Sequence, residues 1–374
     1  MKHRILILCL LLTLTFTTAL AGTSPVRDVG LDLLGSSVHY PQLTGSAYPE
    51  AQAAINAAIM EKGRINDYIT RMAALANSPV KLTVTYTCYQ GGDVFSCAIL
   101  ADGAVETSRA TQVWSTVNMN TFTGEEITFA DLFTDVDAAI AFIESYLDEQ
   151  VAPELSAHLA AGSLTPLPEQ FTLSATGLTL YYDIDSFRTL SDRAGTVKLL
   201  WSELPAELMA HDLAKSHQTF PSNLAYVYTD HLAEGAFPDI PAALGQSVQE
   251  LVDRYALLTD PDIYEGGRMI ALEDGAFRGV YILTDALTEE FDQSMVQGIR
   301  ADRLNFLGLC TGVTTMDAWR EALGEPETTL AVSEERAESW RIVPGTSDYY
   351  TFGDCRLRLH ADESGVLRSV FLTK

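Results

Sequence analysis

The sequence predicts an α+β protein built from two kinds of module. Stretches 49–76 and 135–159 place apolar residues at helical spacing, and the runs around them alternate apolar and polar residues as antiparallel strands do. In the last third, a helix followed by strands occurs twice in succession. We therefore predict an N-terminal mixed domain of antiparallel strands with packed helices, followed by a duplicated helix-plus-antiparallel-sheet module.

The chain begins like a signal peptide. Basic residues at 2–4 precede an unbroken apolar and threonine run, and Ala19 and Ala21 are small residues at the cleavage-determining positions. We expect cleavage after Ala21 and export of the remaining residues. Cys9 lacks the small residue that precedes a lipidated cysteine, and no later run reaches the roughly 20 apolar residues of a membrane span.

Acidic residues dominate the composition. The chain has 50 Asp and Glu against 24 Lys and Arg, a formal charge of -26 at pH 7 that becomes -28 when Lys2 and Arg4 leave with the signal peptide. This argues against nucleic acid as a partner. A basic protein, a divalent cation or a cationic surface would be attracted, although acidity by itself predicts only solubility and steering.

The length of the chain exceeds what one hydrophobic core normally serves, so several domains are expected. The sequence divides into a signal peptide (1–21), a mixed domain (22–210), a polar, proline-marked linker (211–241), a first helix-sheet repeat (242–290) and a second repeat (291–374).

The stretch from Trp114 to Phe133 carries the clearest local pattern. A strand ends at residue 120, turn residues follow, and 125–129 reads as a short second strand. A plain hairpin before a helix explains these residues as well as any family motif does. The motif positions are Asn120, Thr123, Gly124, Ile127, Thr128, Asp131, Leu132 and Phe133.

This motif resembles an extracellular family of largely unknown function. The family occurs in RsiV-type anti-sigma factors, which sense lysozyme, and at the N-terminus of PdaC-type peptidoglycan deacetylases. A strand ending at Leu43, a helix containing Ile55-Asn56-x-x-Ile59 and a last hairpin at 171–182 extend the resemblance over about 29–210. It implies a lysozyme-like protein or a cell-wall fragment as ligand, with structural roles for the motif residues.

Counting residues back from a hairpin loop predicts that two cysteines of the mixed domain lie opposite each other. A two-residue loop at Gly92-Asp93 sets Cys88 opposite Cys97 on one hairpin, and in an exported protein such a pair is expected to form a disulfide. A redox or metal pair is the alternative, but there is neither a Cys-x-x-Cys motif nor a nearby histidine.

The predicted duplication is based on similar segments at the start and at the end of the two repeats. The segment 244–248 leads into one helix and 311–315 into the next, and the final strands pair 278–282 with 368–372. The second helix, entered at Gly312 and left at Gly324, resembles those of small exported modules of the SmpA and beta-lactamase-inhibitory-protein type, which usually bind proteins. Of the three possible connectivities we favour Cys88 with Cys97 and Cys310 with Cys355, the second pair tying the helix entry to the sheet.

No catalytic constellation emerges from the sequence. His211, Asp212 and His217 are metal-ligand types, but their spacing fits no standard site, and a solvated linker explains them better. Glu125 and Glu126 could be considered as the paired carboxylates of a glycan hydrolase, yet adjacent residues on a strand point to opposite faces. We predict no cofactor, no metal and no catalytic residue.

Two classes of function remain, beside a bare structural scaffold. The first is an exported, non-catalytic binding protein of the bacterial cell envelope that recognises a lysozyme-like protein or a wall fragment. The second is a peptidoglycan hydrolase whose carboxylates meet only in the fold. The membrane helix and sigma-binding segment of an anti-sigma factor are not found in the sequence, which argues against direct transcriptional signalling.

Overall fold

The computed structural model describes residues 26–105, 111–155, 164–182, 195–215, 220–221, 223–238, 240–252, 257–259, 264, 267–272, 277–287, 291 and 293–374. The predicted signal peptide, its cleavage site after Ala21, and His217 lie outside them. The described elements form mainly antiparallel sheets with packed helices, which confirms the α+β class. The chain divides after Glu126 into an N-terminal and a C-terminal unit.

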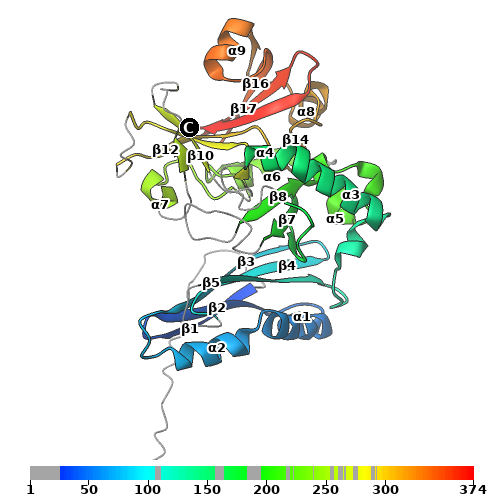
Figure 1. Cartoon of the computed structure of the whole chain (residues 1–374). Helices are drawn as coiled ribbons and strands as arrows, with labels where there is room; N and C mark the ends of the chain where they lie inside the picture. Colours follow the sequence, from blue (N-terminus) through cyan, green and yellow to red (C-terminus); the bar gives the residue numbers. More distant parts are fainter. Residues whose placement is uncertain are drawn as a thin grey trace, which may run out of the picture. The chain divides into compact units, whose positions relative to one another are not determined.

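The N-terminal unit is one five-stranded sheet with helices on one face (Figure 1). The strands lie in the order β1 (Val26–Leu33), β2 (Ser36–Leu43), β3 (Leu82–Gly91), β4 (Val94–Gly103) and β5 (Thr111–Asn120). Only β2 and β3 run parallel, because a helical crossover joins them. That crossover consists of α1 (Pro49–Lys62) and α2 (Ile65–Ala74).

The helix predicted over 49–76 is interrupted at Gly63 and Arg64. Arg64 adopts a left-handed φ of 52°, which ends the α1 hydrogen-bond ladder and lets α2 begin at the next residue. Both helices bury residues at helical spacing against the sheet. This core includes Ile55, Ile59, Ile65, Tyr68 and Met72 from the helices and Leu82, Val84, Phe95, Cys97, Ile99 and Val117 from the strands.

The second strand predicted at 125–129 is not formed. A single bridge joins Met119 to Glu126, and a 3-10 turn, Phe129–Leu132, follows. Thr128 and Asp131 close a capping box around that turn, which satisfies backbone donors locally and favours a helical turn over a strand.

The first part of the C-terminal unit is a helix and a three-stranded sheet. Asp135 caps α3 (Val136–Tyr146) by accepting a hydrogen bond from the Ala138 amide at 3.0 Å. A π turn (Leu147–Val151) and α4 (Ala152–Glu154) continue the helix, whose predicted end at 159 lies outside the described residues. The antiparallel strands are β6 (Gln170–Leu173), β7 (Gly177–Tyr181) and β8 (Thr196–Leu200).

The stretch predicted as a linker, 211–241, is part of the folded unit. It contains α5 (Asp212–Lys215) and α6 (Leu224–Leu232). Tyr228 is fully buried, and its hydroxyl donates to the carbonyls of Phe306 and Leu307 at 3.1 and 2.8 Å. Polar residues, together with Pro221, Pro238 and Pro241 outside these short helices, give the stretch the composition of a linker.

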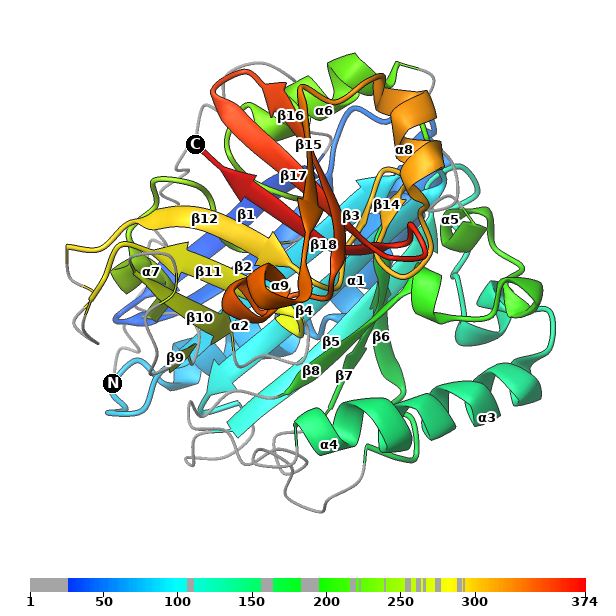
Figure 2. The ribbon, with the colours of Figure 1, turned by 90° about the horizontal axis from the view of Figure 1, so that it is seen from above.

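An eight-stranded antiparallel sheet dominates the rest of the unit (Figure 2). Its order is β15 (Thr328–Val332), β16 (Gly345–Phe352), β17 (Cys355–Asp362), β18 (Leu367–Thr373), β12 (Val296–Ala301), β11 (Val280–Thr284), β10 (Arg268–Leu272) and β9 (Leu257–Thr259). A small hairpin pairs β13 (Asn305–Phe306) with β14 (Leu309–Cys310).

The sheet consists of two four-stranded meanders that meet at their last strands, β12 and β18. Helix α7 (Val248–Val252) precedes the first meander and α8 (Met316–Leu323) the second, while α9 (Glu334–Trp340) lies between β15 and β16. The sequence match of 278–282 with 368–372 makes β11 the counterpart of β18 in the two predicted repeats. It therefore assigns β12 to the second repeat. By strand order β12 completes the first meander, and the shared valine-aromatic-aliphatic pattern of β11 and β18 explains the shift.

One face of this sheet forms the main core of the unit. Alternate residues of the central strands point into it together with Trp319 of α8 and Tyr228 of α6. The strand residues are Val280, Ile282, Ile299, Ala301, Tyr350, Phe352, Leu357, Leu359, Ala361, Val370 and Leu372. The opposite face is free to carry polar and charged side chains.

Candidate functional site

The first half of the motif builds a turn. The Asn120 side-chain oxygen accepts hydrogen bonds from the amides of Phe122 and Thr123 at 2.9 and 3.0 Å, and its amide nitrogen donates to Asp93. Gly124 has a φ of 74°, and a Cβ there would lie 2.8 Å from the Ala51 backbone. Asparagine and glycine are thus used for local structure.

The second half of the motif caps a 3-10 turn and contributes buried apolar side chains. The Asp131 carboxylate accepts hydrogen bonds from the Thr128 amide and hydroxyl at 2.7 and 2.6 Å, which hold the pKa of Asp131 below its usual value. Ile127, Leu132 and Phe133 are buried. These contacts account for the motif residues without a ligand.

Cys88 lies directly opposite Cys97, as the two-residue loop requires. Their sulfurs are 3.7 Å apart, and both are free thiols in this structure. The hydrogen bond with Cys88, together with burial, raises the pKa of Cys97. Cross-strand neighbours at this spacing need only a small movement to form a disulfide.

We predict that Cys88 and Cys97 form a disulfide under oxidising conditions. Reduction should lower the free energy of unfolding by about 2 to 3 kcal/mol on the chain-entropy model for so short a loop. Urea unfolding with and without reductant measures the change, with Cys88→Ser/Cys97→Ser as the variant in which reductant should have no effect. Alkylation of Cys88 and Cys97 in denaturant without reductant would contradict the pairing.

The predicted Cys310–Cys355 bridge is not formed in the structure. Cys310 donates its thiol hydrogen to the Asn305 side-chain oxygen at 3.0 Å, and burial raises the pKa of Cys310 to about 12. Cys355 is also a buried free thiol. The Asn305 amide in turn donates to the Thr176 carbonyl, so Cys310 belongs to a network that ties β13 to the three-stranded sheet.

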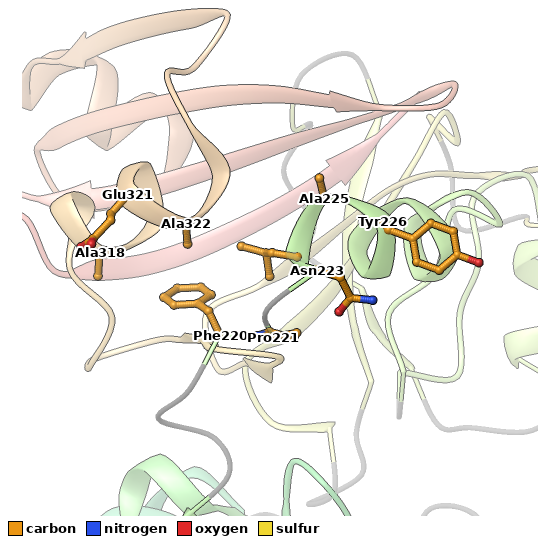
Figure 3. A pocket seen from close by; sticks show the side chains of 9 residues that line it. Phe220, Pro221, Asn223, Ala225, Tyr226, Ala318, Glu321 and Ala322 are labelled. Carbon is orange, nitrogen blue, oxygen red and sulfur yellow. The ribbon is translucent and has the colours of Figure 1, made fainter.

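An open groove lies between the start of α6 and α8 (Figure 3). It has a volume of about 730 Å³ and is lined by Phe220, Pro221, Asn223, Leu224, Ala225, Tyr226, Ala318, Glu321 and Ala322. Phe220 lies below the methyl groups of Ala318 and Ala322, with Glu321 on the same helix and Tyr226 extending away at the far end. Tyr226 is 66% exposed, which is unusual for a tyrosine side chain.

The groove depends on a glycine. Gly308 has a φ of 94°, and a Cβ at this position would lie 2.6 Å from the Phe220 ring. The absent side chain therefore leaves the space in which Phe220 sits against the core and forms the groove floor.

A second feature crosses the polar face of the eight-stranded sheet. Five strands place Tyr349, Arg358, Phe371, Arg300 and Tyr281 opposite one another in a single row that alternates aromatic rings and arginines. The Arg358 guanidinium lies 4.3 Å from the Phe371 ring centre, and that of Arg300 lies 5.2 Å from the Tyr281 ring centre. We call these five residues the arginine-aromatic row.

Helix α9 packs over the row and depends on it. Arg300 donates to the carbonyls of Trp340 and Arg341 at 3.3 and 2.7 Å, which satisfies acceptors at the helix C-terminus, and it forms two hydrogen bonds with Asp302. The Trp340 ring lies 4.2 Å from the Arg358 guanidinium. The row was not predicted from the sequence, although the alternation Arg356-x-Arg358-x-His360 on a strand indicates a charged sheet face.

His360 lies beside the row and is held neutral. It is fully buried, with one ring nitrogen 3.0 Å from the Ser347 hydroxyl and the other 2.8 Å from the Val343 carbonyl. Burial and the nearby charges of Arg358 and Arg300 lower the pKa of His360 despite the carbonyl contact. Its role is to connect β17 to β16 and to the loop before it.

Metal ligands do not gather in the described part of the chain. No group of three or more His, Cys, Asp and Glu side chains there has an arrangement that could hold a metal ion. His211 accepts a hydrogen bond from the Leu213 amide at 3.2 Å, a local contact at the start of α5. Among the same residues, no helix is both long enough and apolar enough to cross a membrane.

In the described part of the chain, the carboxylates with displaced pKa values, Asp131, Glu203, Asp348 and Asp362, all have a lowered pKa. For Glu203, Asp348 and Asp362 burial would raise the pKa, but hydrogen bonds and the charges of Arg303, Arg320 and Arg368 outweigh burial and lower it. A general acid of a glycosidase needs a raised pKa, so these three groups do not fit that role.

Comparison with known proteins gives a limited result. No family model and no curated protein matches the sequence. Two solved structures of DUF3298 family proteins are similar in part. One, from Bacteroides fragilis NCTC 9343, is 11% identical with a TM-score of 0.37 and covers 51% of this chain and 94% of its own. The other, from Pseudomonas aeruginosa PAO1, is 12% identical with a TM-score of 0.37 and covers 50% and 95%. Values this low say nothing about function.

Proposed function

We propose that the protein is an exported, non-catalytic binding protein of the bacterial cell envelope, and that its partner is a basic protein of the lysozyme type. The observation that carries the proposal is the uneven distribution of charge. Residues 127–374 contain 40 acidic and 16 basic residues, a net charge of -24, whereas 22–126 contain 10 and 6, a net charge of -4. The acidity is therefore a property of the C-terminal unit.

Ion pairs inside this unit leave its net charge negative. Four of its arginines form ion pairs with carboxylates of the same unit, and each pair cancels one acid against one base, so the net charge of -24 is unchanged. The pairs are Arg300–Asp302, Arg303–Glu203, Arg320–Asp348 and Arg368–Asp362. A field of this sign raises the association rate of a basic protein.

The groove between α6 and α8 supplies a place for one anchor of such a partner. A lysine or arginine could lay its aliphatic stem on Phe220 and Ala322 and bring its charge to Glu321. Tyr226 beside it offers an exposed aromatic surface, and tyrosine is enriched among residues that dominate binding energy. Resemblance to RsiV-type proteins suggests lysozyme as the first partner to test.

Calorimetric titration of the exported chain with a c-type lysozyme, at low salt and at 0.5 M salt, tests the proposal. We expect saturable binding that weakens but survives at high salt, because exposed charge pairs are screened while groove contacts are not. A basic protein of another fold serves as the control for non-specific attraction. Binding that disappears at 0.5 M salt, or that the control reproduces, would sink the lysozyme assignment.

Variants locate the anchor. Tyr226→Ala and Glu321→Gln should each weaken lysozyme binding about tenfold, the effect of losing roughly 1.4 kcal/mol at an interface contact. Glu335→Gln removes one exposed acid elsewhere on the same unit and should change affinity little. Equal effects of Glu321→Gln and Glu335→Gln would mean that charge acts without the groove.

The hydrolase alternative rests on a second, polar hollow. It has a volume of about 580 Å³, and acids from distant segments, Asp317, Asp362 and Glu363, line it. Asp362 is committed to Arg368 and to the amide of Ser364 at 2.6 and 2.9 Å, which leaves it structural. Release of reducing ends from purified peptidoglycan, abolished by Asp317→Asn or Glu363→Gln, would favour this alternative.

A further inference from the structure

Side chains of the eight-stranded sheet hold α9 in place by its C-terminal end. Arg300 donates to the carbonyls of Trp340 and Arg341. His360 contacts the carbonyl of Val343, in the loop that follows the helix, at 2.8 Å. Of these two side chains only histidine changes its charge readily between pH 5 and 8. The attachment of the loop therefore includes one group that titrates.

The contacts of His360 fix which of its nitrogens carries the hydrogen. A carbonyl oxygen can only accept, so Nε2, which faces Val343, donates, and Nδ1 of the neutral ring accepts from the Ser347 hydroxyl at 3.0 Å. The Ser347 oxygen accepts in turn from Arg358 Nε at 3.2 Å. The hydrogens of this chain all point the same way, from Arg358 towards Val343.

A second proton on His360 does not fit this arrangement. It would place a hydrogen on Nδ1 against the Ser347 hydroxyl, which would have to turn its own hydrogen away from the ring. His360 and Ser347 are both fully buried, so solvent cannot accept that hydrogen in the closed structure. The charged ring is stable only where water reaches it.

The charges around His360 also oppose a second proton. The ionisable groups of the elements packed around it are Arg358 on β17, Arg300 and Asp302 at the end of β12, Tyr264 before β10, Arg341 in the loop and the exposed Glu334, Glu335 and Glu338 of α9. Asp302 favours the charged ring, but it already forms two hydrogen bonds with Arg300. Burial and the charges of Arg358 and Arg300 outweigh it and lower the pKa of His360.

We propose that α9 and the loop 341–344 form a cover that opens locally when His360 takes up a second proton. Neighbouring strands enclose the ring on both sides, so the loop is the element whose movement brings water to it. Val343 is 43% exposed, and Arg341 has a left-handed φ of 53°, a strained conformation that opening would release. Opening would uncover Arg358, in the middle of the arginine-aromatic row. This device is separate from the groove and goes beyond the proposed binding function.

Acid favours the open state of the cover. There His360 meets water and titrates near its ordinary pKa of about 6.5, whereas in the closed state its pKa is lower. The open state therefore binds protons more readily, so opening increases as pH falls below about 6.5 and levels off below the closed-state pKa. Protonation of an exposed histidine limits the increase between pH 7.5 and pH 5.0 to about thirtyfold.

Hydrogen exchange of the exported chain at pH 7.5 and at pH 5.0 tests the proposal, with each rate corrected for the pH dependence of intrinsic exchange. Protection factors in peptides covering 334–344 should fall by about threefold or more, while those of α8 change little. His360→Gln keeps a neutral amide that can donate to Val343 and should abolish the difference. His231→Gln, which replaces an exposed histidine of the same unit, should leave it intact.

Three results would overturn the cover. A fall of less than about threefold in the wild-type protein would show that acid does not open it. The same fall in His360→Gln would assign the effect to another group. A fall that α8 shares in the wild-type protein would mean that the whole unit loses stability. The first and third results are read from the wild-type protein, so they do not depend on the folding of His360→Gln.

Discussion

Replacing Asp348 by alanine is expected to lower the free energy of unfolding by about 4 kcal/mol, the largest effect of any single substitution proposed for this chain. Asp348 is fully buried, and it accepts hydrogen bonds from the Trp319 indole at 2.9 Å and from the Arg320 guanidinium at 2.7 and 2.8 Å. Thr329 donates a further bond at 2.7 Å. The carboxylate therefore joins α8, β15 and β16.

Loss of the carboxylate would leave a guanidinium and a buried indole without their acceptor. Urea unfolding followed by tryptophan fluorescence measures the effect, and Asp354→Ala, an exposed aspartate in the turn after β16, is the matched control with little expected change. A loss below about 1 kcal/mol in Asp348→Ala would show that the network is not a principal link between the helix and the sheet.

The same carboxylate predicts a pH dependence. Burial opposes ionisation, but the hydrogen bonds and charge of Arg320 dominate, so the pKa of Asp348 is lower in the folded protein than in the unfolded chain. Its contribution is therefore complete above the unfolded pKa and is lost as pH falls through the folded value. The difference in stability between wild type and Asp348→Asn should be larger at pH 7 than below pH 3.

Replacing Arg303 by methionine is expected to cost about 3 kcal/mol and to loosen the join between the three-stranded and eight-stranded sheets. Arg303 follows β12 and donates to both oxygens of Glu203, which follows β8, at 2.7 and 2.6 Å. It also donates to the carbonyls of Arg278 and Lys198 at 3.2 and 3.1 Å. Both side chains are largely buried, so the substitution would leave the Glu203 charge uncompensated.

A double-mutant cycle with Glu203→Gln isolates this pair. We expect the two single variants to lose more together than Glu203→Gln/Arg303→Met loses, because the double variant leaves no unpaired charge. Additive losses by urea unfolding would mean that the pair contributes no coupling and that the carbonyl contacts of Arg303 carry its effect.

Local structure was largely predictable from the sequence. The loop at Gly92-Asp93 fixes the hairpin register by counting, and the α8 entry at Thr315 caps the helix by accepting from the Ala318 amide. Patterns of this kind depend on neighbours along the chain. The break at Arg64 was missed because a left-handed arginine has no sequence signature.

Features that depend on distant segments were not predictable. The arginine-aromatic row requires five strands in one register, and α6 looks like a linker until Phe306 and the surrounding core supply the surface for Tyr228. The same holds for the groove, because Phe220 packs against α8 in the space left by Gly308, which is distant from it in the chain. Short motifs therefore identified turns and caps, and tertiary packing created the candidate sites.

Hydrogen exchange of the full chain with and without c-type lysozyme, at 0.5 M salt, tests most directly whether the acidic C-terminal unit carries the binding function. We expect protection in peptides that contain the start of α6 and α8, with little change in 26–126. Protection confined to 26–126, or no protection where calorimetry shows binding, would contradict the claim that the groove between α6 and α8 holds the partner.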